Sequence, residues 1–390
     1  MIFSHCPTKR IFGSQSVRSL CVDVPSQARI AVVTSRTAWR NSGSILLEEF
    51  SSIADRIVID ALEIDQGEPD FVRASQLADT FQFQRINTII AIGGGSIIDL
   101  CKAASVMSFF QGDAINRWVS LKNSAFDTPA LDLMVVSTVP GTSSESNNGF
   151  VISDPDGFKA AFSKKYTFPK VMAFDPALSS SLSETQLQLG LFDALVHVAE
   201  QCIRTDRMDL TNDGFCIAAL STLLDLHRRL VNGAFDSDDL LRFSRISTHI
   251  IDSATLGRGV SVDFVTHELA VFLSGYLKIP HASTLACVFP EYLEHPAHAP
   301  YRIRFEQLMQ LAVQQINGFY HQNMCTHFNL RQHISQSRLI PNQVEWVRDQ
   351  PSRLDVENYL RSRSGFFEKK SVSLEAAHEI LLNAMERLHA

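Results

Sequence analysis

Short apolar β-rich runs that alternate with helical patterns restrict the folds open to the first 180 residues of this chain. The β-rich runs lie at 28–35, 56–60, 87–93, 131–137 and 171–174. Helical spacing of apolar residues separates them, as at 70–82 and 97–110. Strands that are joined through helices pair in parallel, because the helix carries the chain back across the sheet. We therefore predict an α/β, Rossmann-like fold with a mostly parallel sheet.

The pattern of apolar residues changes near residue 180. From Ser183 onward the spacing is mostly helical, as in ETQLQLGLFDALVHVAEQCI and FCIAALSTLLDLHRRLV. A chain of 390 residues is also long enough for two domains. We predict an α/β domain over 1–180 and an all-α domain over 181–390.

Charge and cysteine content argue against several classes of protein. The net charge is −7, and no cluster of Lys and Arg with interleaved aromatics marks a nucleic-acid partner. No apolar run is long enough to span a membrane, and MIFSHCPTKRIFGSQS lacks the apolar core of a signal peptide. Seven cysteines without a CxxC motif are typical of reduced thiols. We therefore expect a cytoplasmic protein without a nucleic-acid or membrane partner.

A glycine-rich turn follows one of the β-rich runs, in INTIIAIGGGSIIDLCKAAS. Glycines let the backbone approach a phosphate closely, and the N-terminus of the next helix favours an anion. Gly94, Gly95 and Ser96 therefore fit the pyrophosphate of a dinucleotide. The alternative is a plain connecting turn, since the spacing differs from the usual GxGxxG fingerprint.

Four residues in the helical half are candidate metal ligands, namely Asp193, His197, His267 and His281. Asp193 and His197 are four residues apart, so both can point to one ion from the same helix face. One carboxylate and three imidazoles suit Fe²⁺ or Zn²⁺. Gly275 and Pro280 predict a helix break before the last histidine. The alternative is a salt-bridged surface pair with two ordinary histidines.

Four motifs occur in one order along the chain: GGGSIIDLCK, STVPGTSSE, Asp-x-x-x-His and His-x13-His. This order resembles the iron-containing (group III) alcohol dehydrogenase family, within the dehydroquinate synthase-like superfamily, from about Ile11 to Pro280. The resemblance implies a dinucleotide-binding domain over 1–180 and a helical metal-binding, catalytic domain over 181–390. It also implies NADP or NAD as one cofactor and Fe²⁺ or Zn²⁺ as the other.

Carried over by residue, the resemblance makes the four candidates the metal ligands, catalytic through the metal: Asp193, His197, His267 and His281. It also implies a set of cofactor-binding residues, which are Gly94, Gly95, Ser96, Asp99, Thr138, Thr142 and Lys159. Ser35 stands at the end of the first Rossmann-like strand, where many NAD-using relatives place an acidic residue. With Arg36 and Arg40 following, this exchange favours NADP. Alternatively both arginines are solvated and either cofactor binds.

Three positions depart from the family pattern. Many members carry a second histidine four residues after the third ligand, and this chain has Val271 there, which removes the usual proton relay. A glycine of the GTGSE pattern is Ser143, and the glycine that often follows the last ligand is Ala282. Val271 and Ala282 imply a substrate unlike the simple short-chain alcohols.

The predicted activity is hydride transfer between a nicotinamide and a small alcohol or aldehyde held at the metal. The substrate class includes hydroxy-, sugar-type and phosphorylated or phosphonate aldehydes. Two alternatives are a non-redox, dehydroquinate-synthase-like lyase and a catalytically degenerate member that binds nucleotide only. By resemblance we also expect a homodimer.

Overall fold

The computed structural model of this protein describes residues 6–64, 69–204, 210–256, 262–277, 279–321, 328–341 and 350–388. The chain forms two compact units. The α/β unit contains His5–Leu182 and Asp236–Asp252, and the helical unit contains Ser183–Phe235 and Ser253–Ala390. The segment Asp236–Asp252 thus belongs to the α/β unit although it lies far into the helical half of the sequence.

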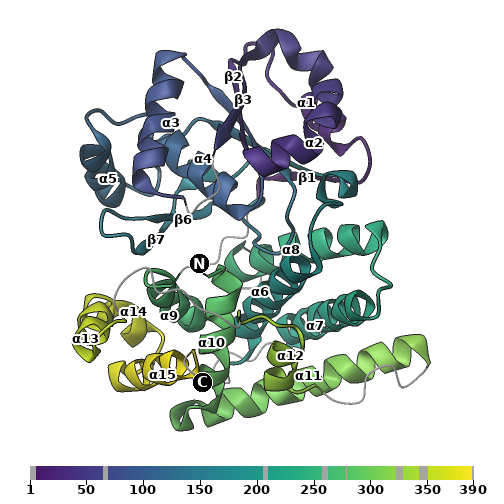
Figure 1. Ribbon diagram of the computed structural model, residues 1–390, viewed down its shortest axis with the longest axis vertical. Coiled ribbons are helices and arrows are strands. Elements are labelled where there is room, and N and C mark those ends of the chain that lie inside the picture. The colour runs from purple at the N-terminus through teal and green to yellow at the C-terminus, as the bar shows by residue number, and fades with distance from the viewer. Residues whose placement is uncertain are drawn as a thin grey trace. The chain divides into compact units, whose positions relative to one another are not determined.

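A six-stranded sheet with the order β1-β8-β5-β4-β2-β3 forms the centre of the α/β unit (Figure 1). Its strands are β1 (Lys9–Phe12), β2 (Ile30–Ser35), β3 (Ile57–Ile64), β4 (Thr88–Gly93), β5 (Asp132–Ser137) and β8 (Val171–Phe174). All neighbouring strands pair in parallel. The predicted fold class is therefore confirmed.

Three strands lie outside the predicted set. The edge strand β1 has four residues and pairs with β8. A separate antiparallel pair joins β6 (Gly149–Ser153) to β7 (Lys159–Ser163). These elements are too short, or too weakly alternating, to produce a clear period of two in the sequence.

Helices cover both faces of the parallel sheet (Figure 1). α1 (Ser16–Cys21) and α2 (Arg36–Glu49) bury Leu20 and Leu46 against one face. α3 (Phe71–Phe83), α4 (Gly95–Met107) and α5 (Ala114–Asn123) lie over the other face. Because helices cover both faces of the sheet, every residue of β4 is buried, and most of these residues are apolar.

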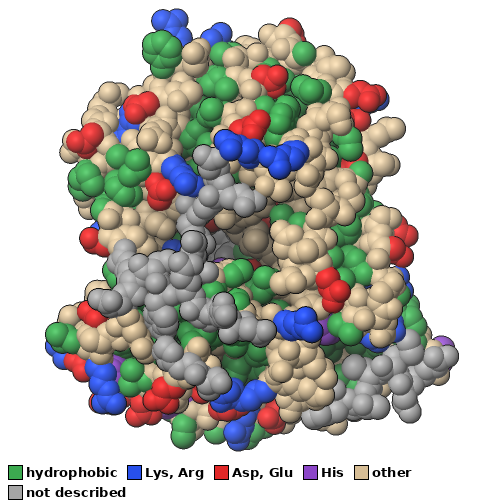
Figure 2. All heavy atoms as spheres, in the orientation of Figure 1, with side chains coloured by type: hydrophobic (Ala, Val, Ile, Leu, Met, Phe, Trp, Pro, Cys, Tyr) green, Lys and Arg blue, Asp and Glu red, His purple; other side chains and the backbone are tan. Residues whose placement is uncertain are grey.

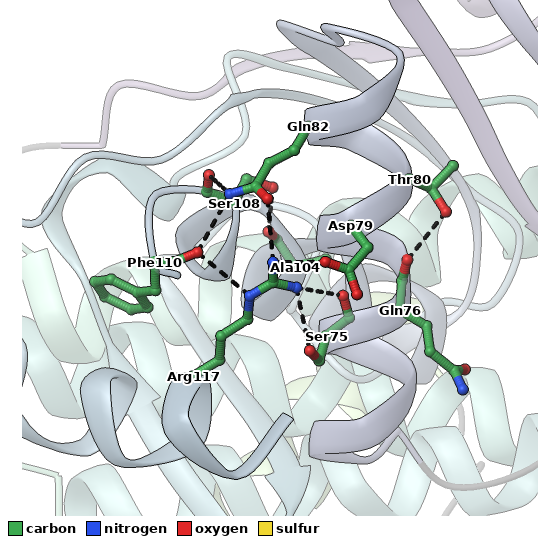
Figure 3. A network of polar contacts seen from close by, with 9 residues as sticks. All are labelled: Ser75, Gln76, Asp79, Thr80, Gln82, Ala104, Ser108, Phe110 and Arg117. Carbon is green, nitrogen blue, oxygen red and sulfur yellow. Dashed lines mark hydrogen bonds and ion pairs between the residues drawn. The ribbon is translucent and has the colours of Figure 1, made fainter. Parts of the chain in front are cut away.

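Arg117 of α5 connects α5 to α3 and to the end of α4 (Figure 3). Its side chain is almost fully buried and donates to Ser75 O at 2.8 Å and to Phe110 O at 3.3 Å. The second Nη donates to Asp79 Oδ1 at 2.6 Å and to Gln82 Oε1 at 3.1 Å. This fork of donors satisfies several acceptors at once, so it stabilises the packing of the helices on that face.

The helical unit is built on α6 (Glu184–Cys202), which begins at a capping box of Ser183 and Gln186. The other helices described in this unit are α7 (Leu210–Val231), α9 (Val265–Ser274), α10 (His281–Glu294), α11 (Ala299–Tyr320), α12 (Leu330–Gln336), α13 (Arg353–Ser362), α14 (Ser364–Lys369) and α15 (Leu374–Arg387). α10 packs against α6, α9, α11 and α15. Short 3₁₀ turns occupy Phe50–Arg56, Lys165–Thr167 and Pro176–Ser179 in the α/β unit, and Pro296–His298 in the helical unit.

One long helix, α8 (Ser237–Leu256), lies mostly in the α/β unit. None of the helices that the structure describes has the length and apolar content needed to cross a bilayer. Figure 2 shows acidic and basic side chains interspersed on the face that it draws.

Candidate metal centre and nucleotide-binding turn

Three of the four predicted metal ligands meet in the helical unit. Asp193 Oδ1 lies 3.5 Å from His197 Nδ1 and 3.5 Å from His267 Nε2. One ligand atom from each of the three residues lies within 4.8 Å of the others. Two ligands bound at about 2.1 Å to a tetrahedral ion are themselves roughly 3.4 Å apart. The two distances from Asp193 therefore fit ligands of one small divalent ion.

The same three atoms are buried and unsatisfied. Asp193 Oδ1, His197 Nδ1 and His267 Nε2 have no hydrogen-bond partner among the residues that the structure describes. Buried polar atoms are nearly always paired, and a separation of 3.5 Å is too long for a good hydrogen bond. One carboxylate oxygen and two imidazole nitrogens match the donors that Fe²⁺ and Zn²⁺ prefer. The residues present therefore fit such an ion.

His281, the fourth predicted ligand, begins α10, after α9 has ended at Ser274. The expected helix break is thus present. The His281 ring centroid lies 5.5 Å from that of His267, while His281 lies outside the group of three close ligand atoms. The structure therefore brings three predicted ligands together and places the fourth next to one of them.

Phe264 forms an apolar wall beside this centre. Its ring meets the ring of His267 edge-on at 5.7 Å and that of His197 at 6.5 Å. The residue caps α9 in the left-handed region, with φ of 55°. A bulky residue rarely adopts this backbone, so the surrounding structure must hold it there.

Glu200 is a site residue that the sequence analysis did not identify. Its Oε2 lies 2.6 Å from His267 Nδ1, and its Oε1 accepts from the His267 backbone N–H at 3.3 Å. The signal was present in the sequence: Asp193, His197 and Glu200 are spaced by four and then three residues, which places them on one helix face.

The charges of this pocket shift several pKa values. Burial raises the pKa of Asp193, but the imidazoles, His197 foremost, outweigh burial and lower it to about 2. Burial lowers the pKa of His197 to about 4. Burial also opposes the charge of His267, but Glu200 and Asp193 outweigh it and raise that pKa to about 10. Near neutral pH the pocket thus holds an ionised carboxylate and a neutral imidazole, both of which can donate electron pairs to an ion.

The predicted nucleotide-binding turn lies in the α/β unit, between the end of β4 at Gly93 and the start of α4 at Gly95. A Cβ on Gly94 would lie 3.1 Å from Val139, and a Cβ on Gly95 would lie 3.0 Å from Thr142 Oγ1. The loop after β5 therefore packs directly onto the glycine turn. Side chains at these two glycines would crowd it.

Two buried hydroxyls beside this turn lack a hydrogen-bond partner among the described residues, namely Ser137 Oγ and Thr142 Oγ1. Ser137 ends β5 and pairs with Gly93. Thr138, the next residue, donates its N–H to Gly93 O at 3.0 Å. The site lies at the carboxyl ends of parallel strands and at a helix N-terminus, where α/β proteins bind phosphates. These groups fit a dinucleotide pyrophosphate.

The remaining predicted cofactor residues differ in their surroundings. Ser96 is exposed in the first turn of α4. Asp99 is buried and accepts from Ser144 Oγ at 2.8 Å and from Val151 N–H at 2.9 Å. Burial raises the pKa of Asp99, against the charges of Lys102 and Lys159. Asp99 thus anchors the loop after β5 to α4.

Ser35 ends β2, and its Oγ caps α2 by accepting from Ala38 N–H at 3.1 Å. Arg36 is exposed, and its Nε lies 3.6 Å from Glu63 Oε2. Arg40 is also exposed. The strand end that contacts an adenosine ribose in Rossmann-like folds therefore carries a hydroxyl and two nearby cations, with one acidic side chain on the adjacent strand.

Ser143, one of the departures from the family pattern, has a left-handed backbone with φ of 59°. Glycine adopts this conformation without steric cost, which explains why a glycine is common there. The side chain of Ser143 is buried and donates to Ser247 O of α8 at 2.6 Å.

Residues 7–176 match the family model described as iron-containing alcohol dehydrogenase, and residues 189–328 match the C-terminal model of that family. The chain belongs to the iron-containing alcohol dehydrogenase family. The predicted family and the predicted class of enzyme, an NAD(P)-dependent oxidoreductase that acts on CH–OH groups, are therefore confirmed.

The names of individual relatives agree with this family and this class of enzyme. The NADPH-dependent aldehyde reductase YqhD of Escherichia coli is 27% identical over 73% of each chain. A Bacillus subtilis protein named "Probable NADH-dependent butanol dehydrogenase 1" is 26% identical over 74% of each chain. The crystal structure of E. coli YqhD matches 98% of both chains with a TM-score of 0.76 at 21% identity, which shows the shared fold.

Proposed function

We propose that this protein is a metal-dependent, NAD(P)-linked alcohol dehydrogenase or aldehyde reductase. The observation that carries the proposal is the buried, unsatisfied group of Asp193, His197 and His267. The names of the E. coli and B. subtilis relatives support it, since both describe nicotinamide-dependent conversion of aldehydes or alcohols.

In this proposal Asp193, His197, His267 and His281 hold Fe²⁺ or Zn²⁺ within the helical, catalytic domain. A bound divalent ion supplies Lewis acidity, which stabilises negative charge on a substrate oxygen. Asp193 provides the negative charge of the ligand set, and the neutral His197 provides an unprotonated nitrogen. Phe264 keeps one side of the centre free of water, which strengthens electrostatic interactions there.

The α/β domain binds the nicotinamide cofactor, which supplies or accepts the hydride. The backbone N–H groups of Gly94, Gly95 and Ser96 receive the pyrophosphate at the N-terminus of α4. The cofactor is lined by side chains from the end of β5, from the loop after it and from β7: Ser137, Thr138, Thr142 and Lys159. Asp99 acts by holding that loop in place. Ser35, Arg36 and Arg40 favour NADP over NAD, because none of them repels a 2′-phosphate.

The substrate is a small alcohol or aldehyde with a further polar group, such as a hydroxy-, sugar-type, phosphorylated or phosphonate aldehyde. Val271 lies one helical turn after His267 on α9 and is partly exposed. A valine cannot transfer a proton, so water or a substrate hydroxyl must carry it at this position. We also propose that the protein is a cytoplasmic homodimer.

The test is oxidation of NADPH and, separately, of NADH by a panel of simple and functionalised aldehydes. The protein is loaded with Fe²⁺ or Zn²⁺ and compared with His267→Ala and with the exposed control His321→Ala. Metal-dependent turnover that is lost only in His267→Ala, with NADPH preferred, is the expected result. Binding of metal and nucleotide without turnover of any aldehyde would contradict the proposal and favour the lyase or the degenerate alternative.

A further inference from the structure

We infer that Glu200 is a positioning residue that fixes the ring orientation and the proton position of His267 for ion binding. The inference rests on the proposed function, since it concerns the same ion. Glu200 is not a ligand in this account, because its two oxygens are already directed at His267.

The contacts of Glu200 restrain His267 in two places. Oε2 lies 2.6 Å from the ring Nδ1, and Oε1 accepts from the backbone N–H at 3.3 Å. A carboxylate can only accept, so Nδ1 carries the proton and Nε2 is the nitrogen that remains for an ion. Nε2 indeed faces Asp193 Oδ1 at 3.5 Å. Carboxylate partners of this kind fix the tautomer of metal-binding histidines and raise their basicity.

The location of Glu200 on α6 explains how two helices form one centre. Asp193, His197 and Glu200 share a face of α6, whereas His267 comes from α9. The Glu200 carboxylate therefore aligns the ligand from α9 with the two ligands from α6. Its backbone carbonyl accepts from Asp263 N–H at 2.9 Å, just before α9 begins.

Burial makes the contact strong. The Glu200 side chain is fully buried, so no bulk water competes for its oxygens. A purely structural ion pair between two helices would have the same geometry. The two roles differ in their consequences, because only a positioning role changes the affinity and the coordination geometry of an ion.

The experiment measures Co²⁺ binding to the full chain by competition with a chromophoric chelator, together with the visible spectrum of bound Co²⁺. Glu200→Gln keeps the size of the side chain and removes its charge, and Glu200→Asp keeps the charge and shortens the reach. Glu291→Gln is the matched control. Glu291 is a buried carboxylate of α10 in the same unit, paired with Arg331 and Arg387, and it lies ten residues beyond His281.

We expect Glu200→Gln to weaken Co²⁺ binding by about 10–100-fold and to change the visible bands, and Glu200→Asp to have a smaller effect. Glu291→Gln should bind Co²⁺ as the wild type does, whatever its melting temperature.

Two other outcomes separate the inference from the proposed function. Equal Co²⁺ affinity and spectra in wild type and Glu200→Gln would overturn the inference alone, and a lowered melting temperature would then assign Glu200 a structural role. Wild-type protein that binds no Co²⁺, or binds it equally after His267→Ala, would overturn the proposed function and the inference with it.

Discussion

Ser143 donates its side-chain hydroxyl to the backbone carbonyl of Ser247 at 2.6 Å, across 104 residues of sequence. This bond joins the loop after β5 to α8 within the α/β unit. The same serine has a left-handed backbone, which costs a non-glycine residue roughly 1–2 kcal/mol. The side chain that causes the backbone strain thus also makes the contact that offsets it.

Ser143→Ala should therefore destabilise the α/β unit by about 1 kcal/mol, because it keeps the strained Cβ and loses the hydrogen bond. Ser143→Gly should be close to neutral, because relief of strain offsets the same loss. Chemical denaturation of the two variants measures the difference. Equal stability of the two variants would show that the backbone strain is negligible, and a Ser143→Ala variant as stable as the wild type would show that the hydrogen bond is negligible.

Gly95→Ala should weaken NADPH binding about tenfold, or about 1.4 kcal/mol. The added methyl meets Thr142 Oγ1 at 3.0 Å and displaces a hydroxyl that we assign to the cofactor. Nucleotide fluorescence on binding measures the affinity. Gly214→Ala in α7 is the control, because its Cβ meets no atom within 4 Å and the helix gains propensity. Unchanged NADPH affinity in Gly95→Ala would contradict the assignment of this turn.

Acid should destabilise the helical unit through a half-buried pair of histidines. The rings of His227 and His333 lie 4.2 Å apart. Burial lowers the pKa of His227 to about 4, and burial together with His227 lowers that of His333 to about 3. Both values are below the ordinary value of 6.5, so the unfolded chain takes up protons first as the pH falls.

The free energy of unfolding should then fall between pH 6.5 and pH 4, by up to about 1.4 kcal/mol per pH unit for each histidine, and should not change for this reason above pH 7. Urea denaturation at several pH values gives the slope. The double variant His227→Gln with His333→Gln should have a shallower slope than the wild type, and an identical slope would refute the role of this pair.

Arg117→Met should destabilise the α/β unit by about 2–3 kcal/mol, because it leaves the carbonyls of Ser75 and Phe110 without their buried donor. Arg117→Lys should retain only part of the stability that Arg117→Met loses, since an ammonium lacks the planar fork of donors of a guanidinium. Lys122→Ala on the exposed side of α5 is the control. Co²⁺ affinity should not change in any of the three variants. A stable Arg117→Met protein in thermal melts would show that Figure 3 depicts a dispensable network.

The local patterns of the sequence predicted the class of fold and most strands of the sheet. The predicted run at 87–93 corresponds to β4 at Thr88–Gly93, and the predicted helix at 70–82 corresponds to α3 at Phe71–Phe83. Such elements can be predicted because the spacing of apolar residues in buried strands and amphipathic helices repeats over several residues. Short elements such as β1 leave no such repeat, and its strand partner β8 lies far away in the sequence.

The sequence by itself determined which side chains are chemically able to bind an ion, because residue type and helical spacing are local properties. Only the tertiary structure decided that Glu200 would meet His267 across 67 residues and that Phe264 would cover both imidazoles. It also decided that Ser143 would be left-handed and bonded to α8. These relationships depend on how separate helices and loops pack against one another. That packing is set by the burial of many side chains together, which no single motif encodes.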